Sequence, residues 1–348
     1  MKIVFWGTPR YALPSLAALR TAGHHLAGVV SQPDRRRGRG GQRQPSPVKA
    51  LAESWGVPVF CPQRIRTDLD VQRQLAALAA DVHVVVAFGQ ILPAEVLQLP
   101  PLGCWNGHGS LLPRWRGAAP IQWSLISGDA ETGVGIMAME EGLDTGPVLL
   151  EGRHRIGLLE NASQLAEALS HLTAELLIAS LPRIEAAGPG DPNHRLQQLG
   201  VRPQGEEGVT RARPLRKADH QIDWTLPALA VHRWVMGLHP GAVCRWQDRR
   251  LKILSSEPLG ATLPADRAAE LSPAAIRLAK EVFGPAADPA TLETPGTVLR
   301  LEGDVGLVVA CGDGNGRLVR EGQLEGRTSA AAGRLLQQMG VRVGDRLG

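Results

Sequence analysis

Residues 82–88 read VHVVVAF, and this continuous apolar run indicates a strand that is buried on both faces of a sheet. Strand-like and helix-like segments alternate around it: Lys2–Gly7 (KIVFWG, strand), Leu13–Thr21 (helix), 25–31 (strand), 48–55 (helix) and 71–80 (helix). Such alternation is typical of α/β proteins with parallel strands. We therefore predict an N-terminal Rossmann-like domain with a mostly parallel sheet.

The pattern changes after residue 188, which indicates a second domain. Before that point, strands are expected at 133–138 and 148–150, followed by a long helix from about Ser163 to near Gly188. Residues 189–208 are rich in Pro, Gly, Asn and Gln and show little periodicity, as linkers do. Short strand-like runs then follow at 251–254, 296–301, 305–310 and 317–319. We predict a first domain over 1–188, a linker over 189–208, and a C-terminal OB-like β-barrel over 209–348, with an insertion near 256–295 that holds a helix around 274–282.

The composition is that of a folded protein with two cores. The chain has 348 residues, of which 43% are apolar and 21% charged, and this excludes disorder for most of it. Its net charge is only +4. The four cysteines are far apart and form no CxxC, which disfavours a disulfide scaffold or a zinc ribbon. No apolar stretch suits a signal peptide or a membrane span, so we expect a cytoplasmic protein.

The segment 102–121, LGCWNGHGSLLPRWRGAAPI, carries the richest set of polar groups. It follows the central strand, and open α/β sheets bind ligands at the carboxyl ends of their strands. Asn106 and His108 are two residues apart, so on an extended backbone both point to the same side. Asp144, in EEGLDTGP (140–147), fits either an Asx-type turn or a carboxylate that orients an imidazole. Taken singly, each of these residues also suits an ordinary structural role.

Arginines gather in two places. The segment 32–48, QPDRRRGRGGQRQPSPV, contains Arg35, Arg36, Arg37, Arg39 and Arg43. This loop is either a solvated surface segment or a basic arm that becomes ordered on phosphates, and the density of guanidinium groups favours the second. A second basic cluster, near the end of the predicted linker, includes Arg211, Arg213 and Lys217. One polyanion touching both clusters would bind both domains.

Together these segments resemble the methionyl-tRNA formyltransferases. The motifs QPDRRRGRG, PSPVK, VVVAFGQILP, LGCWNGHGSLLPRWRGAAPIQ, GDAETGVGIM, GLDTG and QIDW stand in that family's order and spacing. The resemblance covers residues 2–255 well and the remainder loosely. HGSLLPRWRG with GLDTG is specific for formyltransferases that use 10-formyltetrahydrofolate, and the arginine loop with SPVK singles out the member that acts on tRNA.

The resemblance implies a role for each matching residue. Asn106, His108 and Asp144 fall on the family's catalytic positions, and Arg39 falls on an arginine directed at the acceptor end of the tRNA. The family's folate-contacting loop corresponds to Ser110, Leu111, Leu112 and Pro113. The implied co-substrate is 10-formyltetrahydrofolate without a metal, the implied partner is initiator methionyl-tRNA bound in part by the second domain, and we expect a monomer without an obligate protein partner. Gly107 departs from the family, which usually has a branched apolar residue there, so we expect a less rigid segment.

These residue types suit formyl transfer to an amine. A free α-amino group has a pKa of roughly 7.7–8.0, so part of it is nucleophilic near neutrality without a metal or a covalent intermediate. Asn106 can donate a hydrogen bond to the oxyanion that develops. His108 can act as a cation that polarises the carbonyl or as a base that takes the proton, and the sequence leaves both roles open.

Three other functions remain as alternatives. A related formyltransferase would use another amine, such as glycinamide ribonucleotide or an amino sugar nucleotide, or would use water. A hydrolase would use Ser110, His108 and Asp144, although the chain has no G-x-S-x-G elbow. A non-catalytic RNA-binding module would explain the arginines alone.

Overall fold

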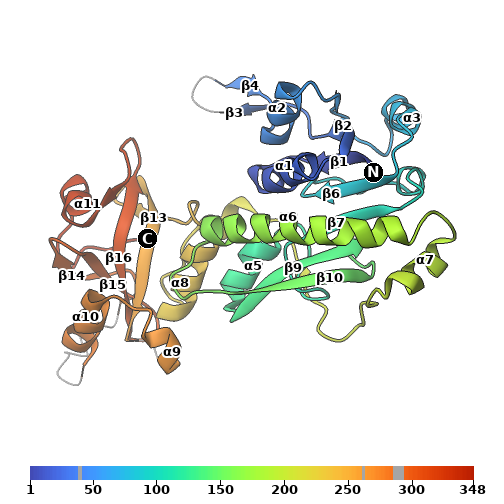
Figure 1. Ribbon diagram of the computed structural model, residues 1–348. Helices are drawn as coiled ribbons and strands as arrows, with labels where there is room; N and C mark the ends of the chain where they lie inside the picture. Colours follow the sequence, from blue (N-terminus) through green and yellow to red (C-terminus); the bar gives the residue numbers. More distant parts are fainter. Residues whose placement is uncertain (38–40, 261–262, 285–293) are drawn as a thin grey trace. The chain divides into compact units, whose positions relative to one another are not determined.

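The computed structural model describes residues 1–37, 41–260, 263–284 and 294–348 and separates the chain into two compact units (Figure 1). Unit 1 consists of Met1–Pro120, Glu131–His154 and Ala166–Arg213. Unit 2 consists of Ile121–Ala130, Arg155–Leu165 and Pro214–Gly348. Among the described residues, no helix has both the length and the apolar character needed to cross a membrane.

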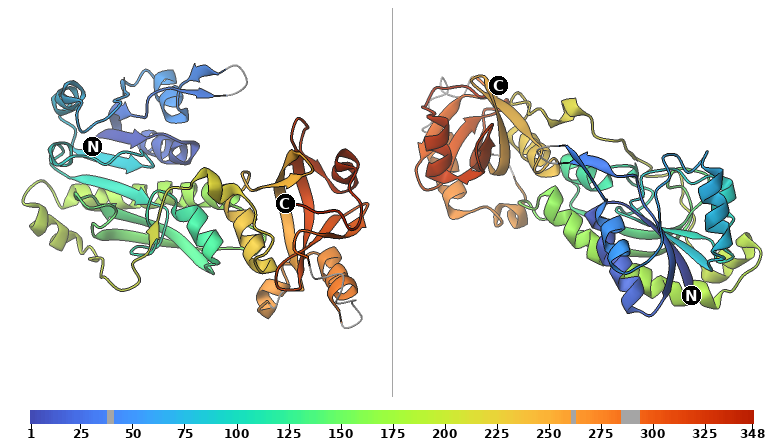
Figure 2. Two further views of the ribbon diagram at one scale, coloured as in Figure 1. Left: turned by 180° about the vertical axis from the view of Figure 1, so that it is seen from behind. Right: turned by 90° about the horizontal axis from the view of Figure 1, so that it is seen from above.

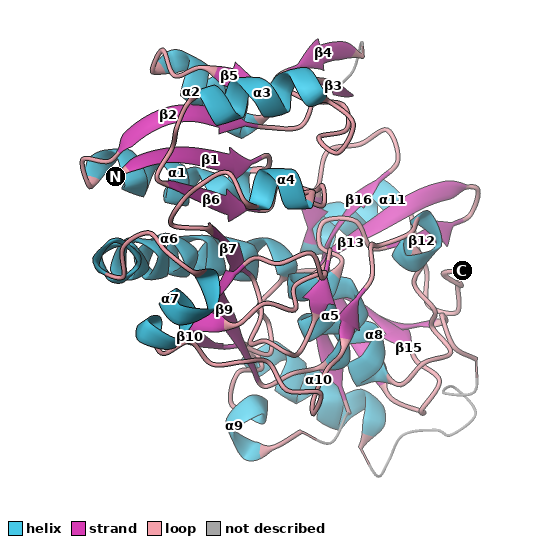
Figure 3. Ribbon diagram, turned by 90° about the vertical axis from the view of Figure 1, so that its right-hand side faces the viewer, coloured by secondary structure: helices cyan, strands magenta, loops and turns pink. Residues whose placement is uncertain are grey.

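A seven-stranded sheet forms the centre of unit 1, in the order β10-β9-β7-β6-β1-β2-β5 (Figure 3). Its strands are β1 (Lys2–Gly7), β2 (His25–Val30), β5 (Val59–Phe60), β6 (Val82–Val86), β7 (Cys104–His108), β9 (Glu131–Ala138) and β10 (Val148–Arg155). The pairs β1–β2, β1–β6, β2–β5 and β6–β7 are parallel, and β7–β9 is antiparallel. The predicted mostly parallel α/β sheet is therefore confirmed. Every residue of β6, at its centre, is buried.

Helices cover both faces of this sheet (Figure 3). One face carries α1 (Leu13–Thr21) and α6 (Ala162–Ala186), and the other carries α3 (Leu69–Ala77) and α4 (Ala94–Leu97). On the second face, Leu75 and Val96 pack in one apolar cluster with Trp6 and Val85. Short elements of unit 1 also include η1 (Arg10–Ala12), α2 (Pro47–Ser54), β8 (Arg116–Gly117), α7 (Pro192–Leu199) and β11 (Arg211–Ala212), whereas α5 (Pro120–Ser127) lies in unit 2 apart from its first residue.

Residues 189–208, for which we expected a linker, lie in unit 1 and contain α7. The Asp191 side chain caps this helix by accepting the His194 N–H at 2.9 Å. Arg195 is buried, and its guanidinium donates to the carbonyl oxygens of Gly188 and Leu102 at 2.6 and 3.0 Å. Because polar contacts hold residues 189–208 in place, the periodicity of apolar residues in the sequence does not predict that this segment is ordered.

Unit 2 is built on an antiparallel sheet ordered β12-β13-β16-β15-β14, with β17 paired to β16. Trp246 of β12 bridges Leu347, and Thr297 beside β14 bridges Arg346, so the last residues link both edges and close the sheet into the predicted barrel. The strands are β12 (Val243–Trp246), β13 (Arg249–Leu259), β14 (Val298–Glu302), β15 (Gly306–Ala310), β16 (Gly316–Leu324) and β17 (Ala330–Ala331).

The helices that the structure describes along residues 214–348 are η2 (Lys217–His220), α8 (Ala228–Gly237), α9 (Ala265–Ala268), α10 (Pro273–Phe283) and α11 (Ala332–Met339). The predicted helix around 274–282 is α10, which begins where the Ser272 hydroxyl accepts the Ala275 N–H at 3.1 Å. The start of the predicted insertion at 256 differs from the structure, because β13 continues in the barrel to Leu259. Residues 261–262 and 285–293 of that stretch lie outside the described residues.

Two buried histidines make the stability of both units depend on pH. Burial lowers the pKa of His83, in β6, and of His232, in α8, from 6.5 to about 3. Between pH 6.5 and about pH 3, each of these histidines binds a proton in the unfolded chain but not in the folded chain. The stability that is present above pH 6.5 is therefore lost as the pH falls through this range.

We predict that lowering the pH from about 7.5 to about 5 reduces the free energy of unfolding by about 2 kcal/mol for each of these histidines. His83→Leu removes one titrating group and should reduce the pH dependence by that amount in urea unfolding. His25→Leu, at an exposed position of β2, is the matched control. The same pH dependence in His83→Leu and in the unmodified protein would contradict the prediction.

Candidate active site

Asn106 and His108 lie on β7, where hydrogen bonds from both neighbouring strands fix the backbone. Asn106 is in register with Val85 of β6 and Met137 of β9, and His108 is in register with Gly135. Residues two apart on a strand point to one side. Both side chains are buried, so β7 presents an amide and an imidazole from a rigid backbone.

Asp144 brings a carboxylate to these two side chains from the turn between β9 and β10. Its Oδ1 lies 3.5 Å from Nδ2 of Asn106, and its Oδ2 lies 3.7 Å from Nδ1 of His108. The side chains of His108 and Asp144 are only 6% and 14% exposed. The amide, the imidazole and the carboxylate therefore meet at one point of unit 1.

The second nitrogen of His108 determines which tautomer is present. Nε2 lies 2.9 Å from the carbonyl oxygen of Trp115. A carbonyl oxygen only accepts hydrogen bonds, so Nε2 carries the hydrogen. In the neutral ring, Nδ1 is then the unprotonated nitrogen, and it is the atom that faces Asp144.

The carboxylate of Asp144 is held by a second loop. Its Oδ2 accepts the backbone N–H of Gly117, in β8, at 2.9 Å. Asp144 has a positive φ of 54°, a conformation that costs a non-glycine residue roughly 1–3 kcal/mol. Such a conformation persists only where the surroundings enforce it. Of the two interpretations of Asp144, these contacts favour the carboxylate placed beside an imidazole.

The loop of Ser110, Leu111, Leu112 and Pro113 turns two of its side chains inward. The Ser110 hydroxyl donates to the carbonyl oxygen of Arg114 at 2.6 Å. Leu112 is 2% exposed and packs against Met137 and Val148. Leu111 and Pro113 are half-buried and leave apolar surface open. With its hydroxyl bonded to Arg114, Ser110 is not arranged as the nucleophile of a triad with His108.

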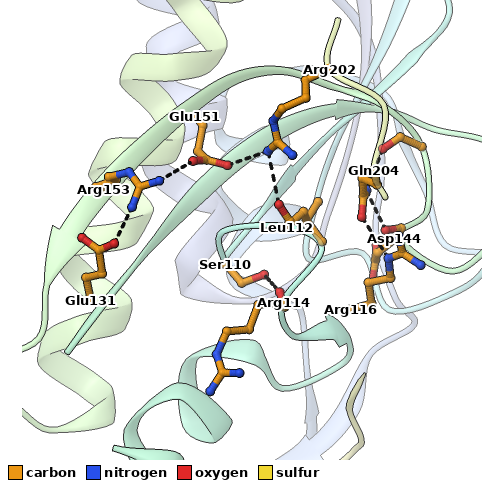
Figure 4. A network of polar contacts seen from close by, with 11 residues as sticks. Ser110, Leu112, Arg114, Arg116, Glu131, Asp144, Glu151, Arg153, Arg202 and Gln204 are labelled. Atoms are coloured by element: carbon orange, nitrogen blue, oxygen red, sulfur yellow. Dashed lines mark hydrogen bonds and ion pairs between the residues drawn. The ribbon is translucent and has the colours of Figure 1, made fainter. Parts of the chain in front are cut away.

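One segment that the sequence did not identify supports the loops of the site. We call residues 201–212 the strap, and Figure 4 shows how two of its side chains reach the site. Arg202 donates to the carbonyl oxygen of Leu112 at 3.2 Å and to the carboxylate of Glu151 at 2.9 Å. Gln204 contacts the turn of Asp144. The only signal in the sequence is the spacing of two polar residues on an extended stretch.

The predicted basic loop is a hairpin of β3 (Arg35–Arg37) and β4 (Gln42–Gln44), visible in Figures 1 and 2. Arg36 and Arg43 lie directly opposite each other across it, and both are exposed with Arg35. Like charges in this position repel each other, so an anion between them would be stabilising. Arg39 lies outside the described residues.

The second basic cluster is divided between the two units. Arg211, in β11, and Arg213 are exposed on unit 1, whereas Lys217 is exposed on η2 of unit 2. The structure thus brings Arg35, Arg36 and Arg43 together on one hairpin, whereas Arg211 and Arg213 belong to unit 1 and Lys217 belongs to unit 2.

A hollow of about 230 Å³ lies at the carboxyl ends of β1, β2 and β6. It is lined by Thr8, Pro9, Gln32, Pro33, Arg35, Gln44, Ser46, Ala87, Phe88 and Gly89. Two of these residues, Arg35 and Gln44, belong to the arginine hairpin, so the hollow connects the hairpin with the ends of β1, β2 and β6. Asn106, His108 and Asp144 do not line it.

Comparisons with known proteins match the whole chain. The family model "Formyl transferase" matches residues 1–181, and "Formyl transferase, C-terminal domain" matches residues 214–340. The methionyl-tRNA formyltransferase of Synechococcus sp. (strain RCC307) is 59% identical over 341 residues, which are 97% of this chain and 100% of that protein. The methionyl-tRNA formyltransferase of Prochlorococcus marinus (strain MIT 9313) is 53% identical over 99% of this chain and 98% of that protein.

Solved structures share the fold at much lower identity. The sugar 3N-formyl transferase WlaRD, solved in the presence of dTDP and 5-N-formyl-THF, has a TM-score of 0.60 and 13% identity over 94% of this chain and 99% of its own. HypX from Aquifex aeolicus in complex with tetrahydrofolic acid has a TM-score of 0.58 and 14% identity over 99% of this chain and 48% of its own. Identities this low show the fold alone.

The space beside Gly107, between the two polar residues of β7, is filled by α6. A Cβ atom on Gly107 would lie 2.5 Å from Cγ2 of Thr173. Thr173 has little freedom to move, because its hydroxyl contacts the carbonyl oxygen of Leu169 at 2.7 Å and the Tyr11 hydroxyl at 2.8 Å. The missing side chain at Gly107 thus lets α6 pack directly against the backbone between Asn106 and His108.

We predict that Gly107→Ala lowers the free energy of unfolding of unit 1 by roughly 1–3 kcal/mol, because the added methyl overlaps Cγ2 of Thr173. Thr173→Ser removes that methyl and keeps the hydroxyl. In urea unfolding, Gly107→Ala should therefore lower the free energy of unfolding much less in the Thr173→Ser background than in the unmodified protein. An equal loss in both backgrounds would show that the overlap is not the cause.

Proposed function

The chain belongs to the formyl transferase family, and we propose that it transfers the formyl group of 10-formyltetrahydrofolate to the free amino group of initiator methionyl-tRNA, giving N-formylmethionyl-tRNA for translation initiation. The family match extends over both domains and the methionyl-tRNA formyltransferases match over their full length. The observation that carries the chemistry is the convergence of Asn106, His108 and Asp144.

Asn106 stabilises the charge that develops on the formyl oxygen. Its side-chain amide is a neutral donor, is buried, and is fixed on a strand that is paired on both sides. A donor that is already oriented pays no reorganisation cost during the reaction, and one such donor is typically worth about 3–4 kcal/mol.

His108 takes the proton that the amine loses as it bonds to the formyl carbon. The proton then passes to N10 of the folate as the bond between N10 and the formyl carbon breaks and tetrahydrofolate leaves. Because Nε2 donates to Trp115, Nδ1 is the nitrogen whose lone pair takes this proton. Asp144, 3.7 Å from Nδ1, stabilises the imidazolium that results. The same carboxylate attracts the Asn106 amide through its other oxygen and so keeps it in place.

The folate supplies the activated formyl group. Only part of the loop of residues 110–113 is available to contact the folate. Leu111 and Pro113 offer apolar surface for a flat ring, and the backbone offers donors and acceptors. Ser110 and Leu112 contribute by holding the loop, because the Ser110 hydroxyl and the Leu112 side chain are committed to protein contacts.

The tRNA binds through cationic side chains. The phosphate contacts that we propose are Arg35, Arg36, Arg37 and Arg43 of the hairpin, together with Arg39, Arg211, Arg213 and Lys217. This requirement separates the proposal from the alternative of a smaller amine, such as glycinamide ribonucleotide or an amino sugar nucleotide, which has no use for so many guanidinium groups. The enzyme acts as a cytoplasmic monomer.

One assay tests the activity and the substrate together. The purified protein is incubated with 10-formyltetrahydrofolate and either charged initiator tRNA, charged elongator tRNA or free methionine. We expect formylation of the initiator methionyl-tRNA only. Comparable formylation of free methionine would refute the role of the tRNA, and formylation of glycinamide ribonucleotide instead would favour the alternative.

We predict that Asn106→Ala lowers kcat by about 10²- to 10³-fold, which is the usual cost of losing one oxyanion donor. The affinity for tRNA should not change, because the amide is buried beside Asp144 and away from the exposed arginines. Single-turnover formylation measures the first quantity and filter binding of charged tRNA the second. A parallel loss of tRNA affinity would contradict this assignment.

We predict that Arg36→Gln combined with Arg43→Gln raises KM for tRNA and leaves the affinity for folate unchanged. These two residues face each other across the hairpin, so the double change removes one local site of positive charge. If both contact phosphates, the slope of log affinity against log salt should become shallower by roughly 1.5–2. Arg73→Gln, on the exposed face of α3, is the control, and an unchanged slope in the double variant would exclude the hairpin as a phosphate site.

A further inference from the structure

We propose that Gln204, in the strap, is a positioning residue for formyl transfer: it fixes the turn that carries Asp144 against the loop that contacts both Asp144 and His108 (Figure 4). The inference rests on the function proposed above and assigns a residue outside the three groups that meet at the site.

The side-chain amide of Gln204 connects two loops. Its Nε2 donates to the carbonyl oxygens of Asp144 and Gly146, at 2.9 and 2.7 Å. Its Oε1 accepts from Nε of Arg116, in β8, at 2.9 Å. Both amide hydrogens and the amide oxygen therefore have partners.

The orientation of this amide follows from the chemistry of its partners. Two backbone carbonyl oxygens need donors, and the guanidinium N–H needs an acceptor. A flipped amide would place its oxygen against two carbonyl oxygens and its NH₂ against a donor. Only a group with two donors on one side and an acceptor on the other fits at Gln204.

The contacts of Gln204 complete a closed path around the site. Arg116 is flanked by Trp115, whose carbonyl oxygen accepts from His108, and by Gly117, whose N–H donates to the Asp144 carboxylate. Gln204 joins this loop to the backbone of Asp144 itself. The separation of the imidazole and the carboxylate therefore depends on the contact that Gln204 makes.

The turn also needs such a contact. Asp144 adopts a positive φ, which its surroundings must enforce. Gln204 donates to the carbonyl oxygens on both sides of Thr145 and so holds the turn at two points. The strap that carries it is exposed at Gly205, Glu206 and Glu207, so the polar contact, rather than apolar packing of these neighbours, keeps Gln204 in place.

The test is Gln204→Glu, which keeps the shape and the acceptor for Arg116 but sets a carboxylate oxygen against the two carbonyl oxygens. We expect kcat for formylation of methionyl-tRNA to fall roughly 10- to 100-fold, because displacement of a catalytic group by about 1 Å has that effect. KM for both substrates should change less than about threefold, since on this proposal Gln204 acts through the turn of Asp144 and the loop of Arg116. Gln198→Glu, the same substitution at an exposed position of α7, should leave kcat unchanged.

Two measurements separate positioning from a general loss of structure. Binding of 5-formyltetrahydrofolate and the thermal midpoint should be nearly the same in Gln204→Glu and in Gln198→Glu. Independently of turnover, the NMR signals of the His108 ring should shift in Gln204→Glu and in Gln204→Ala, and should not shift in Gln198→Glu.

The outcomes discriminate this inference from the proposed function. Unchanged kcat in both Gln204 variants, or a fall in kcat matched by lost folate binding and a lower midpoint, would overturn the positioning role. An unmodified protein that does not formylate methionyl-tRNA would refute the proposed function alone. In that case the His108 signals decide the matter, because unmoved signals in the Gln204 variants would overturn the positioning role as well.

Discussion

The structure of the site depends on one constraint, the burial of the Asp144 carboxylate. A charged group that is largely removed from water must find hydrogen-bond donors or opposite charge in the protein. Asp144 finds them in the amide of Asn106, the backbone N–H of Gly117 and, once protonated, the imidazole of His108. These partners come from β7 and from β8, so satisfying one carboxylate forces two separate loops to meet the end of a central strand. The catalytic geometry and the stability of the loops thus have the same cause.

The sequence predicted the elements that bury apolar residues with a clear period. Lys2–Gly7 and Leu13–Thr21 have the predicted bounds, and the strand of residues 82–88 is β6 with two residues fewer. The three residues of the proposed site are found by motif, since no periodicity connects Asn106 with Asp144. The strap escaped prediction because it is held by side chains that bond to backbone carbonyls, as Arg202 and Gln204 do, and such contacts leave no pattern in hydropathy.

The same physics explains why the sequence of the basic segment predicts a loop and not a hairpin. The hairpin β3–β4 is short and exposed, and its strands consist of arginine and glutamine, so it lacks the alternation of apolar and polar residues that reveals a half-buried strand. In the proposed function, the chemical step and the binding of tRNA therefore depend on polar groups in opposite environments. Chemistry relies on buried groups fixed before the substrate arrives, and tRNA binding relies on exposed charges whose effect extends through solvent and weakens with salt.

The role of His108 shows what coordinates add to a motif. Asn-x-His with a distant Asp is compatible with an imidazolium that polarises a carbonyl and with a neutral base. The contact of Nε2 with the Trp115 carbonyl identifies Nδ1 as the nitrogen that gains or loses the proton, because Nε2 carries its hydrogen in the neutral ring and in the imidazolium alike. Asp144 faces that same atom, so its charge acts most strongly after the proton has arrived. A carboxylate beside the nitrogen that receives the proton of the attacking amine is the arrangement that the proposed base requires.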